Sequence, residues 1–285
     1  MSVNKKRLRT YFSSSKTAHA ITCPVIRPAE EEEAISMSRT NDEWKAAIEA
    51  KIAEVVADSS LTNYASGITT ADSSFALTID HTLLKPDATP SQVDTLCDEA
   101  IRYGFKVANR LKDSECVPCA VVGFPLGAMT SQAKAWETED ACRNGAKEVD
   151  MVINIGLAKS SQHNALYDDI HAVVKAASSY AIVKVIIETA LLTDKEKITA
   201  SFIAAEAGAT FVKTCTGFSG GAASAADVRL MKKAVAYKQG VKVKASAGVR
   251  TFEKCLEMLQ AGAERIGTSS GTAIMEKAEV QASTY

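Results

Sequence analysis

The chain has 285 residues, of which 46% are hydrophobic and 24% are charged, a composition typical of globular proteins. Its 33 Lys and Arg nearly balance 34 Asp and Glu, which argues against a nucleic-acid binder driven by bulk positive charge. No apolar stretch approaches the length of a transmembrane helix, so we expect no membrane partner. The seven scattered cysteines favour a reducing compartment over a disulfide-stapled secreted protein.

The first segment differs from the rest of the chain in charge. Residues 1–29 contain basic side chains and no acidic one, and an acidic run, Glu30 to Glu33, follows. This serine-rich stretch has no helical apolar stripe, so we predict that residues 1–40 form a disordered tail. A mitochondrial transit peptide is the alternative, because such signals are basic and poor in acids. The two interpretations predict a cytoplasmic and a mitochondrial protein, respectively.

The folded part of the chain is predicted to begin near residue 41. Asn41 resembles a helix N-cap, with acidic residues in the turn that follows, and it leads into a predicted helix over residues 41–57. The last ten residues have no strong pattern. We therefore expect one domain over residues 41–277 and a C-terminal tail over 278–285.

From residue 75 the chain alternates between apolar runs and amphipathic segments, and glycines mark many of the junctions. The predicted strands are residues 75–79, 117–122, 149–153, 182–187, 210–213, 241–244 and 265–267. The predicted helices are residues 91–103, 131–144, 164–178, 194–207, 225–238 and 252–261. Strands that alternate with helices in this way indicate an α/β protein with a parallel sheet.

The number of repeats favours a (β/α)8 TIM barrel over a doubly wound sheet. No G-x-G-x-x-G follows the first predicted strand, which weakens the dinucleotide-binding alternative. One gap is anomalous, because between residues 79 and 117 there is room for only one good helix and a short apolar stub at 106–108. We therefore expect the second strand of the barrel to be absent or truncated.

Catalytic groups of parallel barrels lie at the carboxyl ends of the strands. The predicted strands end in or contain Asp80, Asp150, Lys213 and Lys244. Lysine is rarely buried, and either lysine alone could reach solvent or pair with an acid. Two lysines on one rim favour a different interpretation, because burial and a second ammonium both lower a lysine pKa, and a neutral amine attacks carbonyl groups. The pattern favours a Schiff-base site.

The loops after the last strands have the composition of an anion site. Glycine-rich turns follow the strands of Lys213 and Lys244, and Gly267-Thr268-Ser269-Ser270-Gly271 opens a predicted helix. Barrels commonly bind phosphate at this position. By contrast, the Cys116-x-x-Cys119 pair lacks partners at zinc-ligand spacing, and we interpret both cysteines as structural. We also expect a structural role for His81, which follows Asp80.

Six sequence blocks, in order and at similar spacing, resemble the deoxyribose-phosphate aldolases, which are class I aldolases on a TIM barrel. The blocks are I-D-H-T-L-L-K-P at 79–86, V-V-G-F-P-L-G at 121–127, E-V-D-M-V-I-N at 148–154, I-E-T-A-L-L-T at 187–193, F-V-K-T-C-T-G-F at 211–218 and V-K-A-S-A-G-V-R-T at 243–251. The resemblance covers residues 75–277. It implies reversible cleavage of 2-deoxy-D-ribose 5-phosphate to acetaldehyde and D-glyceraldehyde 3-phosphate in deoxyribonucleotide catabolism, with no metal and no cofactor.

The resemblance also implies a role for each site residue. Lys213 matches the Schiff-base lysine, Lys244 the second lysine that keeps it neutral, Asp150 the proton-relay aspartate and Asp80 a further aspartate linked to that relay. The residues that match the family's phosphate loops are Gly217, Gly248, Ser269 and Ser270.

The chain departs from the family pattern at two places. Ala247 stands where the family usually has a glycine, and a methyl group there would be strained if φ were positive. The family also has a strand resembling S-V-C-V-N-P after Gly104-Phe105, and about ten residues with that strand are missing here. No residue of this chain can be assigned to the cysteine and asparagine of that strand.

Two alternatives to an active aldolase follow. The chain could be another phosphosugar lyase or isomerase that works without an imine. It could also be a barrel that lacks a strand and is inactive or only binds a phosphosugar. For the aldolase we expect a small-molecule phosphosugar substrate, and a homo-oligomer is possible.

Overall fold

The computed structural model describes residues 39–60, 62–64, 67–107 and 116–282, with side chains described as far as Glu276. The predicted disordered or targeting segment, residues 1–40, lies outside the described residues as far as residue 38, and so does the C-terminus from residue 283. Among the described residues, no helix combines the length and the hydrophobicity that crossing a bilayer would need.

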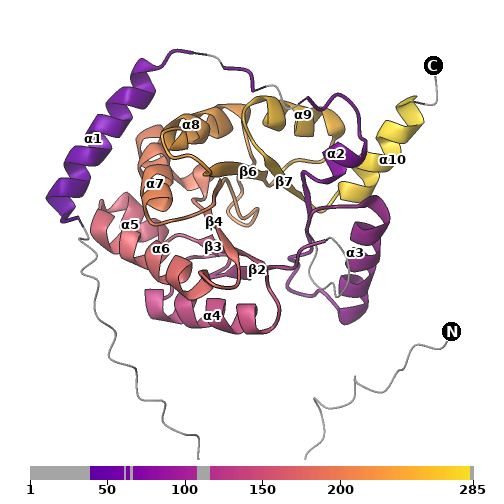
Figure 1. The fold of residues 1–285 in the computed structure, drawn as a ribbon, viewed down its shortest axis with the longest axis horizontal. Coiled ribbons are helices and arrows are strands. Elements are labelled where there is room, and N and C mark those ends of the chain that lie inside the picture. The colour runs from indigo at the N-terminus through magenta and orange to yellow at the C-terminus, as the bar shows by residue number, and fades with distance from the viewer. Residues whose placement is uncertain (1–38, 61, 65–66, 108–115, 283–285) are drawn as a thin grey trace, which may run out of the picture. The chain divides into compact units, whose positions relative to one another are not determined.

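Seven parallel strands form one curled sheet inside a ring of helices (Figure 1). Their order is β1-β7-β6-β5-β4-β3-β2, so each strand after β2 lies beside the strand that precedes it in the chain, and β7 returns to β1. The strands are β1 (Ile79–His81), β2 (Cys119–Val122), β3 (Glu148–Val152), β4 (Ile182–Ile186), β5 (Phe211–Lys213), β6 (Lys242–Ser246) and β7 (Arg265–Thr268). This is the α/β barrel architecture that the alternating pattern predicts.

The second strand of the barrel is reduced to a bridge between β1 and β2. Val107 forms isolated parallel bridges with Asp80 on one side and Val117 on the other. The N–H of Lys106 donates to the carbonyl of Ile79 at 3.0 Å, and the carbonyl of Lys106 accepts from Val117 at 2.9 Å. Lys106 and Val107 therefore span the gap between β1 and β2 with backbone hydrogen bonds and bridges to both sides. The second strand is truncated as expected, but β1 and β2 are still connected at these two residues.

The helices that cover the sheet largely follow the predicted segments. They are α1 (Asn41–Ala57), α3 (Pro90–Tyr103), α4 (Ser131–Arg143), α6 (His163–Ala177), α7 (Asp194–Glu206), α8 (Ala225–Val235), α9 (Phe252–Gln260) and α10 (Gly271–Ala282). Threonine side chains cap many of them, and α1 begins with a capping box between Thr40 and Glu43. The N-cap is thus Thr40 and not Asn41, which is the first helical residue.

Several local elements differ from the prediction. Residues 73–76 form a short helix, α2 (Ser73–Ala76), because the Asp72 carboxylate accepts hydrogen bonds from the N–H groups of Ser74 and Phe75. The first strand therefore begins at Ile79 and not at residue 75. The short helices α5 (Ile155–Lys159) and η1 (Thr189–Leu191) were not predicted. Helix α10 continues to Ala282, beyond the predicted domain end at 277.

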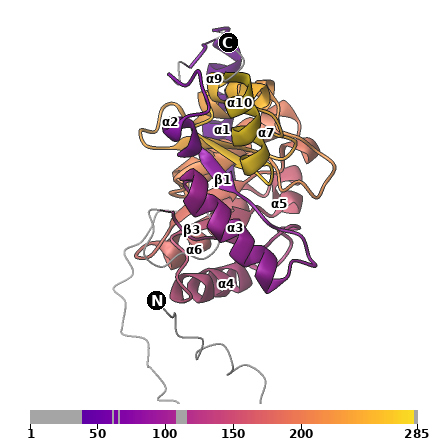
Figure 2. The same ribbon diagram turned by 90° about the vertical axis from the view of Figure 1, so that its right-hand side faces the viewer.

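Helix α10 packs on the outside of the barrel beside the first strand, β1. It contacts α9, α3 and β1, and the two views agree that α10 and α3 lie side by side (Figures 1 and 2). Helix α1 packs on the outside of α6, α7 and α8 through the buried side chains of Trp44, Ile48 and Val55. The C-terminal segment and the start of the fold thereby hold the ring of helices together.

Candidate active site

The four residues predicted to carry the chemistry meet inside the barrel. The ammonium groups of Lys213 and Lys244 both contact Oδ2 of Asp150, at 2.7 and 2.8 Å. Lys244 also contacts Oδ2 of Asp80 at 2.5 Å. All four side chains are buried. The structure thus brings together side chains from β1, β3, β5 and β6 that are up to 164 residues apart (244 minus 80).

Strand register explains why these side chains converge. Lys213 of β5 pairs directly with Lys244 of β6, so the two side chains leave the sheet side by side. Asp150 of β3 pairs in the same way with Lys184 of β4. Successive residues of a strand point to opposite faces of the sheet, so the residues directly before and after each of these charged side chains point outward into the helices. The barrel interior collects the polar residues, while neighbours such as Val212 and Val243 pack in the core.

Three further charged side chains belong to the cluster, and the sequence analysis missed them. Lys184 contacts Asp150 Oδ1 at 2.7 Å and Glu148 Oε2 at 2.5 Å. Arg265 bridges Asp80 at 2.5 Å and Glu148 at 3.2 Å. A signal was present, because Glu148 and Asp150 are two residues apart in one strand and Lys184 lies within an apolar strand. Inward-facing charges two apart in a buried strand indicate a polar barrel interior.

Electrostatics keep both aspartates ionised. Burial by itself would raise the pKa of Asp150, but the ammonium groups of Lys184, Lys213 and Lys244 hold that pKa well below its usual value. Burial opposes the ionisation of Asp80 as well, and Lys244, Lys184 and Arg265 outweigh it, so its pKa is also lowered. Buried carboxylates that are surrounded by cations remain acceptors at neutral pH.

Among the three lysines, only Lys213 is driven toward its neutral form. Burial lowers its pKa, and the nearby charge of Lys244 lowers it further, against the attraction of Asp150. The pKa values of Lys244 and Lys184 are raised instead, because carboxylates outweigh the cost of burying each ammonium group. Four cationic side chains face three carboxylates, so four minus three leaves one positive charge in excess. Loss of the Lys213 proton makes the cluster neutral.

The truncated second strand borders this cluster. A cavity of about 30 Å³ adjoins Lys213, Lys244 and Asp150, and Val107 lines its wall together with Cys119. The Cys119 thiol lies 3.3 Å from Asp150 Oδ1, and burial followed by the charge of Asp150 raises its pKa to about 12. Cys119 is therefore a neutral thiol at the site. Cys116 donates to backbone carbonyls and does not join it, and the part of the chain that the structure describes holds no side-chain cluster suited to a metal ion.

A second cavity of about 230 Å³ opens from Lys213 toward the glycine-rich loops. Gly248 and Ser269, two of the four residues predicted for a phosphate site, line it together with Thr216 and Arg250. Gly217 and Ser270 are not among its lining residues. The N–H of Ser270 donates to Thr268 Oγ1 at 3.0 Å, which occupies it within the loop. Ala247 also lines the cavity and has φ +78°, the strained conformation considered for this position.

His81 lies at the edge of the cluster but engages elsewhere. Its Nε2 contacts Glu99 Oε2 at 2.7 Å, and its ring packs beside Phe105. This ties β1 to α3, a structural connection like the one predicted.

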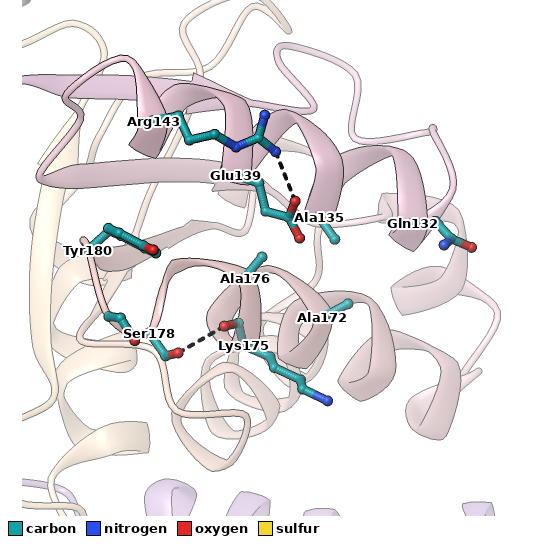
Figure 3. Close-up of a pocket in the computed structure, with 10 residues that line it drawn as sticks. Gln132, Ala135, Glu139, Arg143, Ala172, Lys175, Ala176, Ser178 and Tyr180 are labelled. Atoms are coloured by element: carbon teal, nitrogen blue, oxygen red, sulfur yellow. Dashed lines mark hydrogen bonds and ion pairs between the residues drawn. The ribbon is translucent and has the colours of Figure 1, made fainter. Parts of the chain in front are cut away.

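A wider groove lies on the outside of the barrel, between α4 and α6. It has a volume of about 710 Å³, and small side chains such as Ala135, Ala172 and Ala176 form its floor (Figure 3). Glu139 and Arg143, which form an ion pair at 3.0 Å, stand at its rim. None of the charged residues of the barrel interior lines this groove, so it is separate from the candidate site.

Comparison with known proteins places this geometry in a family. The model of the DeoC/LacD family aldolases matches residues 106–277. A deoxyribose-phosphate aldolase of Staphylococcus carnosus is 53% identical over 216 residues, which cover 72% of this chain and 97% of that protein. The deoxyribose-phosphate aldolase of Listeria welshimeri is 54% identical over 208 residues, 69% of this chain and 92% of its own.

Solved structures agree with the sequence relatives. A crystal structure from Coccidioides immitis, provisionally described as a deoxyribose-phosphate aldolase, superposes with a TM-score of 0.76 at 37% identity, covering 85% of this chain and 99% of that one. The tetrameric deoxyribose phosphate aldolase from Aeropyrum pernix has a TM-score of 0.66 at 33% identity, covering 73% of this chain and 92% of its own. The chain therefore belongs to the DeoC/LacD family of aldolases.

Proposed function

We propose that this chain is a class I aldolase that reversibly cleaves 2-deoxy-D-ribose 5-phosphate through a Schiff base on Lys213. The observation that supports this most directly is the buried contact of Lys213 and Lys244 with one oxygen of Asp150. It provides an amine with a lowered pKa, a neighbouring ammonium group and an ionised carboxylate. These are the groups that imine chemistry needs. The similarity to curated deoxyribose-phosphate aldolases supports the choice of substrate.

In the first step, the neutral amine of Lys213 attacks the C1 aldehyde of the open-chain sugar. The resulting carbinolamine loses water and leaves a protonated imine, which accepts electrons. Lys244 is the proton donor for the departing hydroxyl in this proposal, because its ammonium group lies on the same carboxylate oxygen as the nucleophile. Asp80 contacts Lys244 and Arg265 and holds this proton network in place.

In the second step, the C2–C3 bond breaks. Asp150, acting through a water molecule, accepts the proton of the C3 hydroxyl as the electron pair of the bond moves into the imine. Glyceraldehyde 3-phosphate leaves with its new carbonyl group at the former C3. The enamine on Lys213 is then protonated at the former C2 and hydrolysed, which releases acetaldehyde and restores the amine.

The substrate phosphate binds in the 230 Å³ cavity, on the loops that contain Gly217, Gly248, Ser269 and Ser270. Binding a group remote from the reacting carbon orients the chain over Lys213, and this binding energy lowers the barrier to cleavage. Arg250 lines the same cavity and adds positive charge to it.

The reaction suits catabolism of deoxyribonucleotides, because its substrate is a deoxyribose phosphate. We propose a cytoplasmic enzyme, consistent with the free cysteines, with a mitochondrial location as the alternative that the basic N-terminal segment raises. A homo-oligomer is the proposed assembly, supported by the tetramer of the Aeropyrum pernix neighbour.

Borohydride reduction in the presence of acetaldehyde tests the central claim. Reduction of the imine leaves an ethyl group on the lysine nitrogen, and peptide mapping should locate that group on Lys213. A Lys213→Met variant should show no such adduct, while a variant at exposed Lys242 should be labelled like the wild type. An unmodified Lys213 in a folded sample, or acetaldehyde release that survives Lys213→Met, would remove the mechanism.

A further inference from the structure

Glu188 occupies a strained backbone position between β4 and η1. Its φ and ψ are 55° and 66°, the left-handed conformation that residues with a side chain rarely adopt. The neighbours on both sides are pinned to β5, because Ile187 N–H donates to the carbonyl of Lys213 at 3.0 Å and Thr189 N–H to that of Thr214 at 3.1 Å. Ile187 and Thr189 are two residues apart, yet the carbonyls they bond to belong to consecutive residues of the other segment. Glu188 is therefore one extra residue on its side, which is a β-bulge.

The bulge turns a carboxylate into the interior, where it holds the next loop. Glu188 is fully buried. Its Oε2 accepts hydrogen bonds from the Thr216 hydroxyl at 2.5 Å, the Thr216 N–H at 3.2 Å and the Ser219 hydroxyl at 3.2 Å. The Thr216 hydroxyl in turn accepts from the N–H of Phe218 at 3.0 Å. One carboxylate oxygen therefore organises residues 216–219.

These hydrogen bonds determine which backbone groups the loop can offer a ligand. The N–H groups of Thr216 and Phe218 are both engaged by them. Between the two lies Gly217, with φ +87°, and the hydrogen bonds on either side fix its peptide groups. Thr216 and Phe218 line the 230 Å³ cavity that also reaches Lys213. The shape of this loop therefore sets one wall of the proposed phosphate site.

We propose that Glu188 is a positioning residue that determines substrate affinity by fixing the 216–219 loop for the substrate's phosphate. The inference rests on the proposed function, because it assumes that the phosphate binds in this cavity. Glu188 itself does not line the cavity, and a carboxylate would repel the phosphate, so its effect passes through Thr216 and Ser219. Non-glycine residues in strained conformations persist where the surrounding structure requires them, and they cluster at functional sites.

The test compares two substrates, 2-deoxyribose 5-phosphate and unphosphorylated 2-deoxyribose. The Glu188→Gly variant removes the carboxylate but suits the positive φ, so relief of the backbone strain should offset part of the stability lost with its hydrogen bonds. We expect its KM for the phosphorylated sugar to rise about tenfold or more, the scale of losing hydrogen bonds to a charged acceptor. The kinetics with 2-deoxyribose, which has no phosphate to bind, should change by less than about twofold.

Two further variants separate the carboxylate from the backbone. In Glu188→Gln, an amide oxygen can replace Oε2 as the acceptor, so the KM for the phosphorylated sugar should return most of the way to the wild-type value. Ser219→Ala removes one of the donors to Glu188 at a side chain that does not line the cavity, and it should raise the same KM by less than Glu188→Gly does. Equal losses with both substrates in Glu188→Gly, or an unchanged KM, would overturn the proposal.

Borohydride trapping distinguishes this failure from a failure of the proposed function. Trapping of acetaldehyde on Lys213 does not involve a phosphate, so Glu188→Gly should be labelled as fully as the wild type. If the wild type is not labelled, the proposed mechanism is wrong. If both are labelled and the two substrates respond alike to Glu188→Gly, only the assignment of Glu188 is wrong.

Discussion

Lys213 and Lys244 place their ammonium nitrogens on the same carboxylate oxygen, Oδ2 of Asp150, at 2.7 and 2.8 Å. The two lysines are register partners on neighbouring strands, so this proximity is built into the sheet. One carboxylate cannot fully compensate two adjacent cations, and Lys244 has a second partner in Asp80 that Lys213 lacks. The pKa of Lys213 is therefore lowered, whereas that of Lys244 is raised.

Replacing Lys244 should alter the pH dependence of imine formation. Without the Lys244 charge, the pKa of Lys213 loses one of the causes that lower it and should rise. Since the neutral amine is the nucleophile, the rate of borohydride trapping at a given pH should fall, and its rise with pH should shift to higher pH. For Lys244→Met we also expect a loss of about 100-fold or more in kcat near neutral pH, the scale of losing a proton-transfer group.

The control for this variant is Lys242→Met. Lys242 lies two residues earlier in β6 and is exposed, so its replacement by methionine should leave the pH profile of borohydride trapping unchanged. A Lys244→Met profile that matches the wild type would show that Lys244 does not set the Lys213 pKa.

Replacing Ala247 with glycine should stabilise the protein. Its φ of +78° costs a residue with a side chain about 1 kcal/mol, and glycine avoids that cost. Ala247→Gly should therefore raise the free energy of unfolding by about 1 kcal/mol in urea titrations. The matched variant Ala245→Gly, in the interior of β6, should lower it by a similar amount, because glycine weakens a regular strand. Destabilisation by both substitutions would show that no strain is released at Ala247.

A buried ion pair outside the cluster should contribute strongly to stability. Lys134 of α4 is fully buried and contacts Asp169 of α6 at 2.6 Å and the carbonyl of Val152 at 2.9 Å. Lys134→Met leaves the Asp169 carboxylate buried without its cation, which should cost about 3–5 kcal/mol of unfolding free energy. The double variant Lys134→Met/Asp169→Leu should recover part of that loss. A loss below about 1 kcal/mol for Lys134→Met, measured by urea unfolding, would contradict this account.

The bridge that Lys106 and Val107 form between β1 and β2 should contribute to the stability of the barrel. The N–H of Lys106 donates to the carbonyl of Ile79, and proline has no N–H to replace it. Lys106→Pro should lower the unfolding free energy by about 1–3 kcal/mol, because a buried carbonyl loses its partner. Lys106→Ala keeps the N–H and should behave like the wild type. If the two variants are equally stable, the bridge does not contribute to closing the barrel.

Much of the fold was predictable from local pattern. Apolar strands that alternate with capped amphipathic helices specify a parallel sheet covered by helices. The boundaries of α3, α4, α6, α7, α8 and α9 lie within a few residues of those predicted, whereas the short α5 was not predicted. Sequence alone also selected Asp80, Asp150, Lys213 and Lys244 as candidates, and the structure brings these four side chains together. Charged side chains in apolar strands are rare enough to be conspicuous. The shortened segment after Phe105 was equally visible as a gap in the repeat.

Tertiary structure decided what those residues do to one another. The inclusion of Lys184, Glu148 and Arg265 in the cluster depends on strand register and on closure of the barrel between β1 and β7, which no local window encodes. The left-handed conformation of Glu188 depends on hydrogen bonds to β5, and the bridging role of Val107 depends on strands that lie on either side of it in space. Sequence determines which side chains are present and which face of an element they share, whereas pKa values and strained conformations arise from contacts between distant segments.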